Sequence, residues 1–367
     1  MGGGTEKPKS EDLLIILPFP EPTKETERIR QKHPHIKVTY IQQNLKPEEV
    51  FAKPLSSIPG SVYKDTTILV TLAALPPNPK QDAPNLDLVH FFSAGTNAFI
   101  HHPIYTSTDI TLTTSSGVHG PQISEWIIMT LLVQSHKYNG MYEQQKKHNW
   151  SRGHTNLNAV RDMVGQRIGI LGYGSIGRQA ARVCQAMGME VLAYTATPKK
   201  TAESKKDKGF IVPGTGDIDG TIPKEWYSGL DKESLHHFLS RDLDVLLVSV
   251  PLTPQTKHLL GAEEFSVLAR RNAFVSNISR GQIIDQPALI EALQYGKLRG
   301  CALDVTDPEP LEPESPLWGM ENVTITPHIS GLSAAYADRS FQILEKNLDL
   351  RERGQKLINV VDRKTGY

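Results

Sequence analysis

The 367-residue sequence has little of what marks several classes of protein. It contains two cysteines, Cys184 and Cys301, and neither has a partner at metal-ligand spacing. Two cysteines in so long a chain do not make a disulfide framework. Lys+Arg and Asp+Glu are equal, at 40 each, so the formal net charge is zero. The composition therefore gives no electrostatic reason to expect a nucleic acid or an anionic membrane as a partner.

Long hydrophobic runs are also absent. The apolar run near the start, Leu13 to Leu17, is too short for a signal-peptide core or a membrane span. No internal repeat of solenoid period is present. With 38% hydrophobic and 22% charged residues, the composition is that of an ordinary globular protein, and the length favours two domains. We expect a cytoplasmic protein.

Short apolar strands alternate with helical stretches along most of the chain. Unbroken apolar strands of this length are typical of parallel sheets covered on both faces, and the alternation predicts an α/β fold with doubly wound sheets. The predicted strands are DLLIILP, IKVTYI, TTILVTLAA, LDLVHFF and ITLTT in the first third, and RIGILG, EVLAYT, DVLLVSVP, NAFVSNI, RGCALDV and NVTITP after residue 160.

Two longer helices are predicted outside this alternation. Residues 123–146 have apolar and small side chains at spacings of three and four, which predicts one long helix between the two groups of strands. A second helix is predicted at residues 333–353. Residues 199–241 do not fit the alternation, because they are polar and longer than most loops in a compact domain. They are either a solvated surface excursion or a binding loop.

The segment RIGILGYGSIGRQAARV predicts a dinucleotide site. The strand at 167–171 leads directly into Gly172-x-Gly174-x-x-Gly177, and a helix follows. Gly172 permits the tight turn, Gly174 lets the backbone approach a pyrophosphate, and Gly177 lets the helix pack on the strand. The helix N-terminus offers free N–H groups and a positive dipole end. The predicted cofactor-binding residues of the loop are Gly172, Tyr173, Gly174, Ser175, Ile176 and Gly177.

The end of the second strand bears on the choice of cofactor. A site that prefers NAD usually has an Asp or Glu there, bonded to the ribose 2′-OH. Here that position holds Thr195, and Lys199 and Lys200 follow shortly after. No carboxylate is present there to repel a 2′-phosphate, and the two lysines would attract one. We therefore predict NADP(H) over NAD(H), with NAD(H) use still open. The alternative is that both lysines are solvated loop charges.

Farther along, the motifs SRGQIIDQPAL, ALDVTDPEPL and NVTITPHISG follow the GYGSIG loop in order. With this order and spacing, the sequence resembles the D-isomer-specific 2-hydroxyacid dehydrogenase family, which includes glyoxylate/hydroxypyruvate reductases and D-3-phosphoglycerate dehydrogenases. Weaker likeness extends through SAGTNAF and LINVVD towards the two ends. The motifs are specific for the family and say little about its substrate.

The resemblance implies that Arg280, Glu309 and His328 are the catalytic residues. A guanidinium can grip the carboxylate of a 2-oxo acid and polarise its carbonyl oxygen. An imidazole can donate the proton that this oxygen needs after hydride transfer, and a neighbouring carboxylate favours its protonated form. Taken singly, Arg280 could cap a strand, Glu309 could be a solvated acid, and His328 could be a buried structural histidine. Together they favour the catalytic interpretation.

Further roles follow from the resemblance. Asp304 and the backbone of Ile278 are expected at the nicotinamide carboxamide, and residues 248–256 along the cofactor channel. Ala94 and Gly95, in the loop from Ser93 to Asn97, are expected to offer N–H groups to the substrate carboxylate, although a plain glycine turn is the alternative. The remaining cofactor contacts are predicted at Val250, Pro251, Thr256, Ser279 and His328.

The family fold implies two Rossmann-like doubly wound domains with the active site in a cleft between them. The substrate domain would comprise residues 1–120 and 331–367, and the cofactor domain residues 121–330. A homodimer through the cofactor domain is expected, in which Trp150, in the arm QQKKHNWSRG, would reach the partner's active site. His119 and Gln122 depart from the family pattern, and His119 is predicted to serve either in an interdomain hydrogen bond or as a substrate contact.

Two other functions stay open at this point. The formate dehydrogenase branch of the fold is disfavoured because members of that branch have a Gln–His catalytic pair, whereas this sequence has Glu309 and His328. A nucleotide-sensing interaction protein, like the corepressors that share this fold, could keep all three catalytic residues. The pairs His101-His102 and His236-His237 are adjacent and do not share a face of a strand or helix, so we predict no metal.

Overall fold

The computed structural model describes residues 11–43, 58–151 and 160–363. The chain divides into two compact units, one of residues 1–118 with 334–367 (unit 1) and one of residues 119–333 (unit 2). Within the described ranges, no helix has the length and apolar character needed to cross a membrane.

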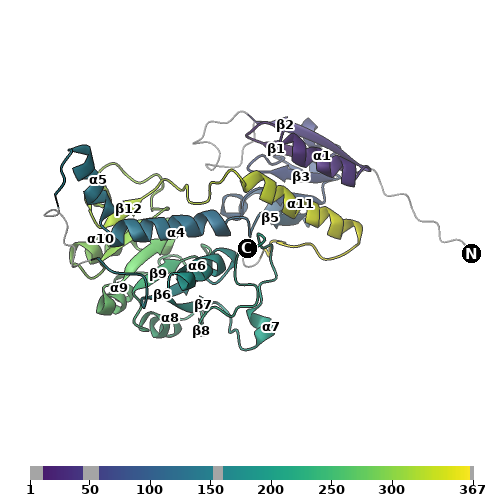
Figure 1. The fold of residues 1–367 in the computed structure, drawn as a ribbon. Helices are drawn as coiled ribbons and strands as arrows, with labels where there is room; N and C mark the ends of the chain where they lie inside the picture. Colours follow the sequence, from purple (N-terminus) through teal and green to yellow (C-terminus); the bar gives the residue numbers. More distant parts are fainter. Residues whose placement is uncertain (1–10, 44–57, 152–159, 364–367) are drawn as a thin grey trace, which may run out of the picture. The chain divides into compact units, whose positions relative to one another are not determined.

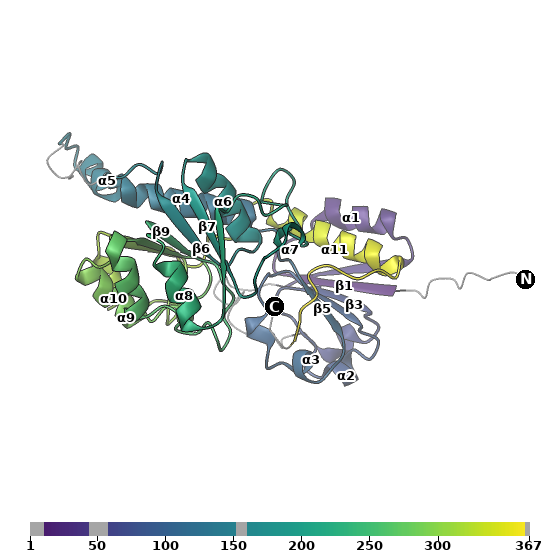
Figure 2. The ribbon, with the colours of Figure 1, turned by 90° about the horizontal axis from the view of Figure 1, so that it is seen from below.

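Unit 1 is built on a five-stranded parallel sheet in the order β2-β1-β3-β4-β5 (Figures 1 and 2). Its apolar strands are buried on both faces, as the sequence predicts for a covered parallel sheet. Helices α1 and α11 lie side by side and are joined by an ion pair of 2.6 Å between Arg28 and Glu345. The elements are β1 (Glu11–Leu17), α1 (Thr23–Lys32), β2 (Ile36–Gln42), β3 (Ile68–Thr71), α2 (Pro79–Asp82), β4 (Leu88–Phe91), α3 (Pro103–Thr106), β5 (Thr111–Thr114) and α11 (Tyr336–Glu352).

Unit 2 is built on a seven-stranded parallel sheet in the order β12-β11-β10-β9-β6-β7-β8. The strand order reverses at β6, and such a switch point is where ligands bind in doubly wound folds. The elements are α4 (Gly120–Ser135), α5 (Tyr138–Lys146), β6 (Arg167–Leu171), α6 (Ser175–Ala186), β7 (Glu190–Thr195), α7 (Ala202–Lys205), β8 (Glu225–Ser228), α8 (Lys232–Leu239), β9 (Val245–Val248), α9 (Ala262–Leu268), β10 (Phe274–Asn277), α10 (Gln286–Gln294), β11 (Gly300–Leu303) and β12 (Val323–Ile325). The predicted α/β class with two parallel-sheet domains is confirmed.

The predicted single helix over residues 123–146 is wrong. Helix α4 ends at Ser135 and α5 begins at Tyr138, and Lys137 between them has a left-handed backbone with φ of 56°. The periodic pattern continues across the break, because both helices have apolar or aromatic side chains at helical spacing. Side-chain periodicity does not report a single left-handed residue.

The segment 199–241 contains more regular structure than its polarity suggests. Strand β8 and helix α8 lie in it, so the βα alternation continues. Strand β8 is short, lies at the edge of the sheet and has no fully buried residue, which explains why it shows no apolar run. The part before β8 folds onto α6, where the Arg178 guanidinium donates to the carbonyl oxygens of Lys205 and Asp217, each at 2.6 Å.

Candidate active site

The glycine-rich loop joins β6 to α6 at the switch point of the unit 2 sheet. Gly172 has a φ of +101°, and a Cβ there would lie 2.4 Å from the carbonyl oxygen of Ser249. A Cβ on Gly177 would lie 2.5 Å from the carbonyl oxygen of Gly172. Both positions therefore require glycine for the protein's own packing. At Gly174 a Cβ would meet no atom within 4 Å, so this glycine leaves open space in front of the backbone.

Helix α6 presents its N-terminus at this open space. Gly174 is its N-cap and supplies no side-chain hydrogen bond, so the first N–H groups of the helix are available to a ligand. The Tyr173 ring is buried, and its hydroxyl donates to Asp217 Oδ2 at 2.8 Å. Burial raises the pKa of the Tyr173 phenol. Only the backbone of Tyr173 is thus suited to contact a cofactor.

Thr195 ends β7 beside the loop. Its hydroxyl donates to the carbonyl oxygen of Thr197 at 2.8 Å, which shapes the turn that leads to Lys199. Lys199 is half-exposed and Lys200 is exposed. The position that would bind a ribose 2′-OH is a short hydroxyl side chain, and cationic side chains follow it.

His328 and Glu309 meet in unit 2. His328 Nδ1 lies 2.6 Å from Glu309 Oε1, and both side chains are partly exposed, at 43% and 42%. An exposed pair contributes little to stability, so this contact is better explained by orientation of the imidazole than by folding energy. With Nδ1 held by the carboxylate, Nε2 is the nitrogen suited to exchange a proton with a ligand.

Asp304 fixes the backbone that carries His328. Its Oδ1 accepts from Thr326 Oγ1 at 2.6 Å and from the Ile329 N–H at 2.9 Å, and its Oδ2 accepts from the N–H and hydroxyl of Ser330. These four bonds fill the carboxylate's usual capacity. His328 itself has a left-handed φ of 54°, a conformation that persists in a non-glycine residue when its surroundings hold it.

The same network continues into α4. Trp126 Nε1 donates to Thr326 Oγ1 at 3.1 Å. Asp304 is almost fully buried, at 1% exposure, so its carboxylate is held in place around His328. Its contact with the nicotinamide carboxamide stays a prediction. Sequence reasoning missed Thr326 and Trp126. The sequence offered one indication of Thr326, which is its hydroxyl two residues before His328. It offered no indication that Trp126 contacts this site.

Arg280 follows β10 and is partly exposed. Its Nη1 donates to the carbonyl oxygen of Ser279 at 2.6 Å, and Asn277 Nδ2 donates to the carbonyl oxygen of Arg280 at 3.1 Å. Burial lowers the pKa of the guanidinium and the charge of Glu309 opposes this, but an arginine stays protonated. Ile278 and Ser279 are buried beside it and bond to the carbonyl oxygen of Val248.

The segment after β9 forms a turn held by its own hydroxyl groups. Thr256 Oγ1 donates to the carbonyl oxygen of Pro251 at 2.6 Å and accepts from the Thr253 N–H at 2.8 Å. Val250 is half-exposed and Pro251 is exposed. All these segments follow the carboxyl ends of strands in one parallel sheet, so they lie along one edge of unit 2.

The predicted substrate loop lies in unit 1, directly after β4. Ser93 Oγ donates to the carbonyl oxygen of Gly95 at 2.9 Å, which closes a tight turn. Ala94 is exposed and Gly95 half-exposed, and neither amide N–H donates a hydrogen bond within the described ranges. The loop therefore has two amide donors available to an anion.

His119 and Gln122 lie at the start of α4. His119 is the N-cap residue, and Gln122 Nε2 donates to the carbonyl oxygen of Gly331 at 3.0 Å within unit 2. A Cβ on Gly331 would lie 3.3 Å from His119 Cδ2. The two departures from the family pattern thus hold the segment that follows His328.

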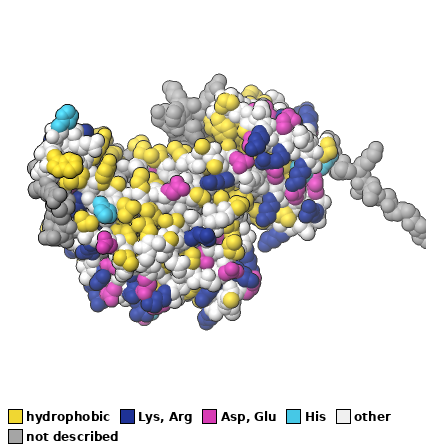
Figure 3. All heavy atoms as spheres, in the orientation of Figure 1, with side chains coloured by type: hydrophobic (Ala, Val, Ile, Leu, Met, Phe, Trp, Pro, Cys, Tyr) yellow, Lys and Arg dark blue, Asp and Glu magenta, His cyan; other side chains and the backbone are white. Residues whose placement is uncertain are grey.

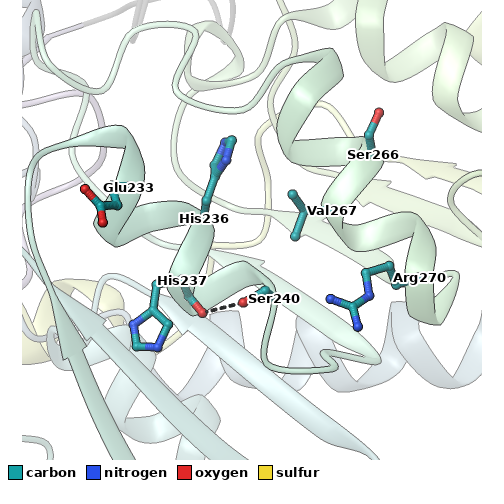
Figure 4. Close-up of a pocket in the computed structure, with 7 residues that line it drawn as sticks. All are labelled: Glu233, His236, His237, Ser240, Ser266, Val267 and Arg270. Atoms are coloured by element: carbon teal, nitrogen blue, oxygen red, sulfur yellow. Dashed lines mark hydrogen bonds between the residues drawn. The ribbon is translucent and has the colours of Figure 1, made fainter.

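The His236-His237 pair lines a shallow hollow between α8 and α9 (Figure 4), and none of the residues drawn there belongs to the predicted site. The two rings point in different directions, and His236 Nε2 pairs with Glu264 at 2.6 Å. The lining residues are Glu233, His236, His237, Ser240, Ser266, Val267 and Arg270.

One group in the described part of the chain has its atoms close enough to hold a metal ion. His33, Asp349 and Glu352 of unit 1 each offer an atom within 4.8 Å of the others. Glu352 already pairs with His33 at 2.5 Å, and Asp349 pairs with Lys32 at 2.5 Å. We assign the group to ion pairing between α1 and α11, and the absence of a metal stays a prediction.

The model of the NAD-binding domain of D-isomer specific 2-hydroxyacid dehydrogenases matches residues 128–213 and 219–330. A glyoxylate reductase of Korarchaeum cryptofilum is 28% identical over 85% of this chain and 87% of its own length. Two other curated relatives, the glyoxylate reductases of Aeropyrum pernix and Pyrococcus horikoshii, align over 55% of this chain and 53% of their own length.

Solved structures extend the likeness to the whole fold. An NADPH-dependent glyoxylate/hydroxypyruvate reductase of Sinorhizobium meliloti, solved with NADP and sulfate, is 26% identical, with a TM-score of 0.69 over 97% of this chain and 100% of that one. A D-isomer specific 2-hydroxyacid dehydrogenase of Xanthobacter autotrophicus, solved with NADPH, is 25% identical, with a TM-score of 0.72 over 98% and 100%. The chain therefore belongs to the D-isomer specific 2-hydroxyacid dehydrogenases, a family of NAD(P)-dependent oxidoreductases.

Proposed function

We propose that the protein reduces a small 2-oxo acid, of the glyoxylate or hydroxypyruvate kind, to the D-2-hydroxy acid with NADPH. The observation that carries the proposal is the 2.6 Å contact between His328 Nδ1 and Glu309 Oε1. It lies on the same edge of unit 2 as the glycine-rich loop and Arg280. Relatives named for glyoxylate and hydroxypyruvate reduction support the substrate class.

The cofactor fits the residues of unit 2. The space in front of Gly174 and the N-terminus of α6 suit a pyrophosphate, and Thr195 with Lys199 suits a 2′-phosphate. The NADP and NADPH bound by the two solved relatives support this preference, and NAD(H) is the second choice. When bound, the reduced nicotinamide supplies the hydride.

The protein's own residues would do the rest of the chemistry. Arg280 binds the substrate carboxylate and draws electron density towards the carbonyl oxygen. The carbonyl carbon gains the hydride, and the oxygen takes a proton from Nε2 of protonated His328, leaving a neutral imidazole. Glu309 holds the ring at Nδ1 and so leaves Nε2 as the nitrogen that donates the proton. Asp304 holds the backbone of His328, through Ile329 and Ser330.

Each unit would have its own role in the proposed reaction. Unit 2 corresponds to the cofactor domain and unit 1 to the substrate domain, although the unit boundaries fall at 118/119 and 333/334, within three residues of the predicted ones. The N–H groups of Ala94 and Gly95 would bind the substrate carboxylate from unit 1.

Following the absorbance of NADPH with a panel of 2-oxo acids tests the proposal. Turnover of glyoxylate or hydroxypyruvate, with a higher kcat/KM for NADPH than for NADH, is the expected result. Binding of NADPH without turnover of any 2-oxo acid would contradict it and favour a nucleotide sensor.

We also propose a homodimer through unit 2. Hydrophobic side chains gather on the face of unit 2 shown in Figure 3, and α4 leaves Met129 51% exposed. Tyr138 and Tyr142 of α5 are exposed as well, and Trp150 is 98% exposed. Exposed apolar groups of this extent suit a protein interface. Light scattering should give a mass near twice 40.7 kDa for the unmodified protein, and a lower mass for Met129→Glu. A monomeric mass for the unmodified protein would refute the dimer.

A further inference from the structure

A polar pocket of about 440 Å³ opens at the other edge of the unit 2 sheet from the glycine-rich loop. Phe274 begins β10, while Arg299 and Asn322 directly precede β11 and β12. Because all the strands are parallel, this edge is separated from the carboxyl edge by the strand length, roughly 13 Å for four residues. The lining residues are Gln134, Ser135, Lys137, Arg161, Asn272, Phe274, Gly296, Leu298, Arg299 and Asn322.

The pocket is positively charged without a matching acid. Lys137, Arg161 and Arg299 line it, and no Asp or Glu does among the residues that the structure describes. The charge of Asp244 acts on Arg299, but this carboxylate already pairs with Arg271 at 2.8 Å and accepts from the N–H of Arg167 at 3.0 Å. Burial lowers the pKa of Arg299 to about 10, and the charge of Arg161 acts in the same direction.

Arg299 has an unused donor. Its Nη2 donates to Gln166 Oε1 at 3.1 Å, while its Nη1 is buried and has no hydrogen-bond partner in the part of the chain that the structure describes. A buried, charged donor without an acceptor is costly. The guanidinium also lies over the Phe274 ring, 5.8 Å from its centre, which fixes its plane. An oxygen anion in the pocket would satisfy the free donor.

Lys137 reaches the pocket through the left-handed break between α4 and α5. A lysine in this conformation is strained, and such strain is common at functional sites. A cation near the end of α4 would also be favoured by the helix dipole. That explains Lys137, but it does not explain Arg161 or the unpaired Nη1 of Arg299.

We propose that this pocket binds a small oxyanion, a phosphate or carboxylate group, at a site separate from the cofactor and substrate. Arg299 would provide the forked donor, and Arg161 and Lys137 the remaining charge. The ligand's negative charge offsets part of the repulsion among the three cations, so it stabilises unit 2 when bound.

The test measures binding rather than turnover, so it does not depend on the proposed reaction. Inorganic phosphate and malonate are titrated against the full-length protein by calorimetry and by thermal unfolding at constant ionic strength. The variants are Arg161→Gln and Lys137→Gly, the second of which also relieves the left-handed backbone. The matched control is Lys297→Gln, which removes a nearby cation that does not line the pocket.

Binding of phosphate or malonate is expected in the unmodified protein and in Lys297→Gln, and a loss of about tenfold or more in affinity in each pocket variant. Anion binding at the glycine-rich loop is common to all four proteins and cancels in the comparison. If the pocket variants lose more affinity for phosphate than for malonate, the site prefers a phosphate group, and the reverse indicates a carboxylate; both support the site. Equal affinity in all four proteins, or no binding of either anion, would overturn the proposal.

Discussion

The first turn after the first strand differs sharply between the two units, although both sheets reverse their order there. In unit 2 the turn after β6 has Gly172 and Gly174, and α6 begins with exposed N–H groups. In unit 1 the turn after β1 is PFPEP, with Pro22 as the N-cap of α1. Glu21 and Glu25 flank that N-terminus, and their negative charges already interact favourably with the positive end of the helix dipole. The same topology therefore presents glycine and free N–H donors together in unit 2, and we expect a phosphate to bind there.

The two units also use histidine differently. His90 lies in β4 of unit 1, fully buried, and burial lowers its pKa to about 4. His328 lies in unit 2, partly exposed and paired with Glu309. The first is kept neutral by the core, and the second is placed where a proton can be exchanged.

His328→Ala should remove most of the proposed catalysis in unit 2 and have only a small effect on nucleotide affinity. We expect kcat to fall by about a thousandfold, since general acid catalysis is worth roughly 10²–10⁴. The affinity for NADPH, measured by fluorescence titration, should be nearly unchanged. His237→Ala is the control and should keep full activity. Near-normal kcat in His328→Ala would remove the assigned role.

His90 should make unit 1 sensitive to acid. Its pKa is lower in the folded state than in the unfolded state, so the unfolded chain takes up the proton first. Stability is therefore complete above about pH 6.5 and declines by up to about 3 kcal/mol as the pH falls to about 4. Hydrogen exchange of the β4 amides measures this loss. His90→Gln should flatten the profile, and an unchanged slope would show that another group is responsible.

Gly174→Ala should separate cofactor binding from folding. The protein itself has room for the methyl group, so the melting temperature should hold, while the pyrophosphate loses its close approach. We expect KM for NADPH to rise by about ten- to a hundredfold. Gly140→Ala in α5 is the matched control, because a Cβ there would also meet no atom within 4 Å. Equal kinetics in the two variants would place the cofactor elsewhere.

Thr195→Asp should produce the smallest effect, a change of cofactor preference. A carboxylate at the end of β7 would repel a 2′-phosphate and accept a hydrogen bond from a 2′-OH. The ratio of kcat/KM for NADPH to that for NADH should fall by about tenfold. Thr197→Ser, two residues on, is the control. If the ratio does not move, the 2′-position of the ribose does not lie at Thr195.

The local motifs could be predicted from the sequence because each depends on a few neighbouring residues. The glycine-rich loop and the apolar parallel strands belong to this group. The break at Lys137 and strand β8 could not, because one left-handed residue leaves the periodicity intact and an edge strand needs no apolar run. The hydrogen bonds that hold the Asp304 carboxylate could not be predicted for a similar reason. Its four hydrogen-bond donors come from residues 22 to 26 positions farther along the chain.

The sequence by itself determined the α/β class, the family and the nucleotide loop, since these follow from residue types at short, regular spacing. Only the tertiary structure decided which side chains meet. It brought His328 to Glu309, filled the carboxylate of Asp304 and left Arg299 Nη1 without an acceptor. Such contacts depend on how distant segments pack, and no single motif determines the free energy of that packing.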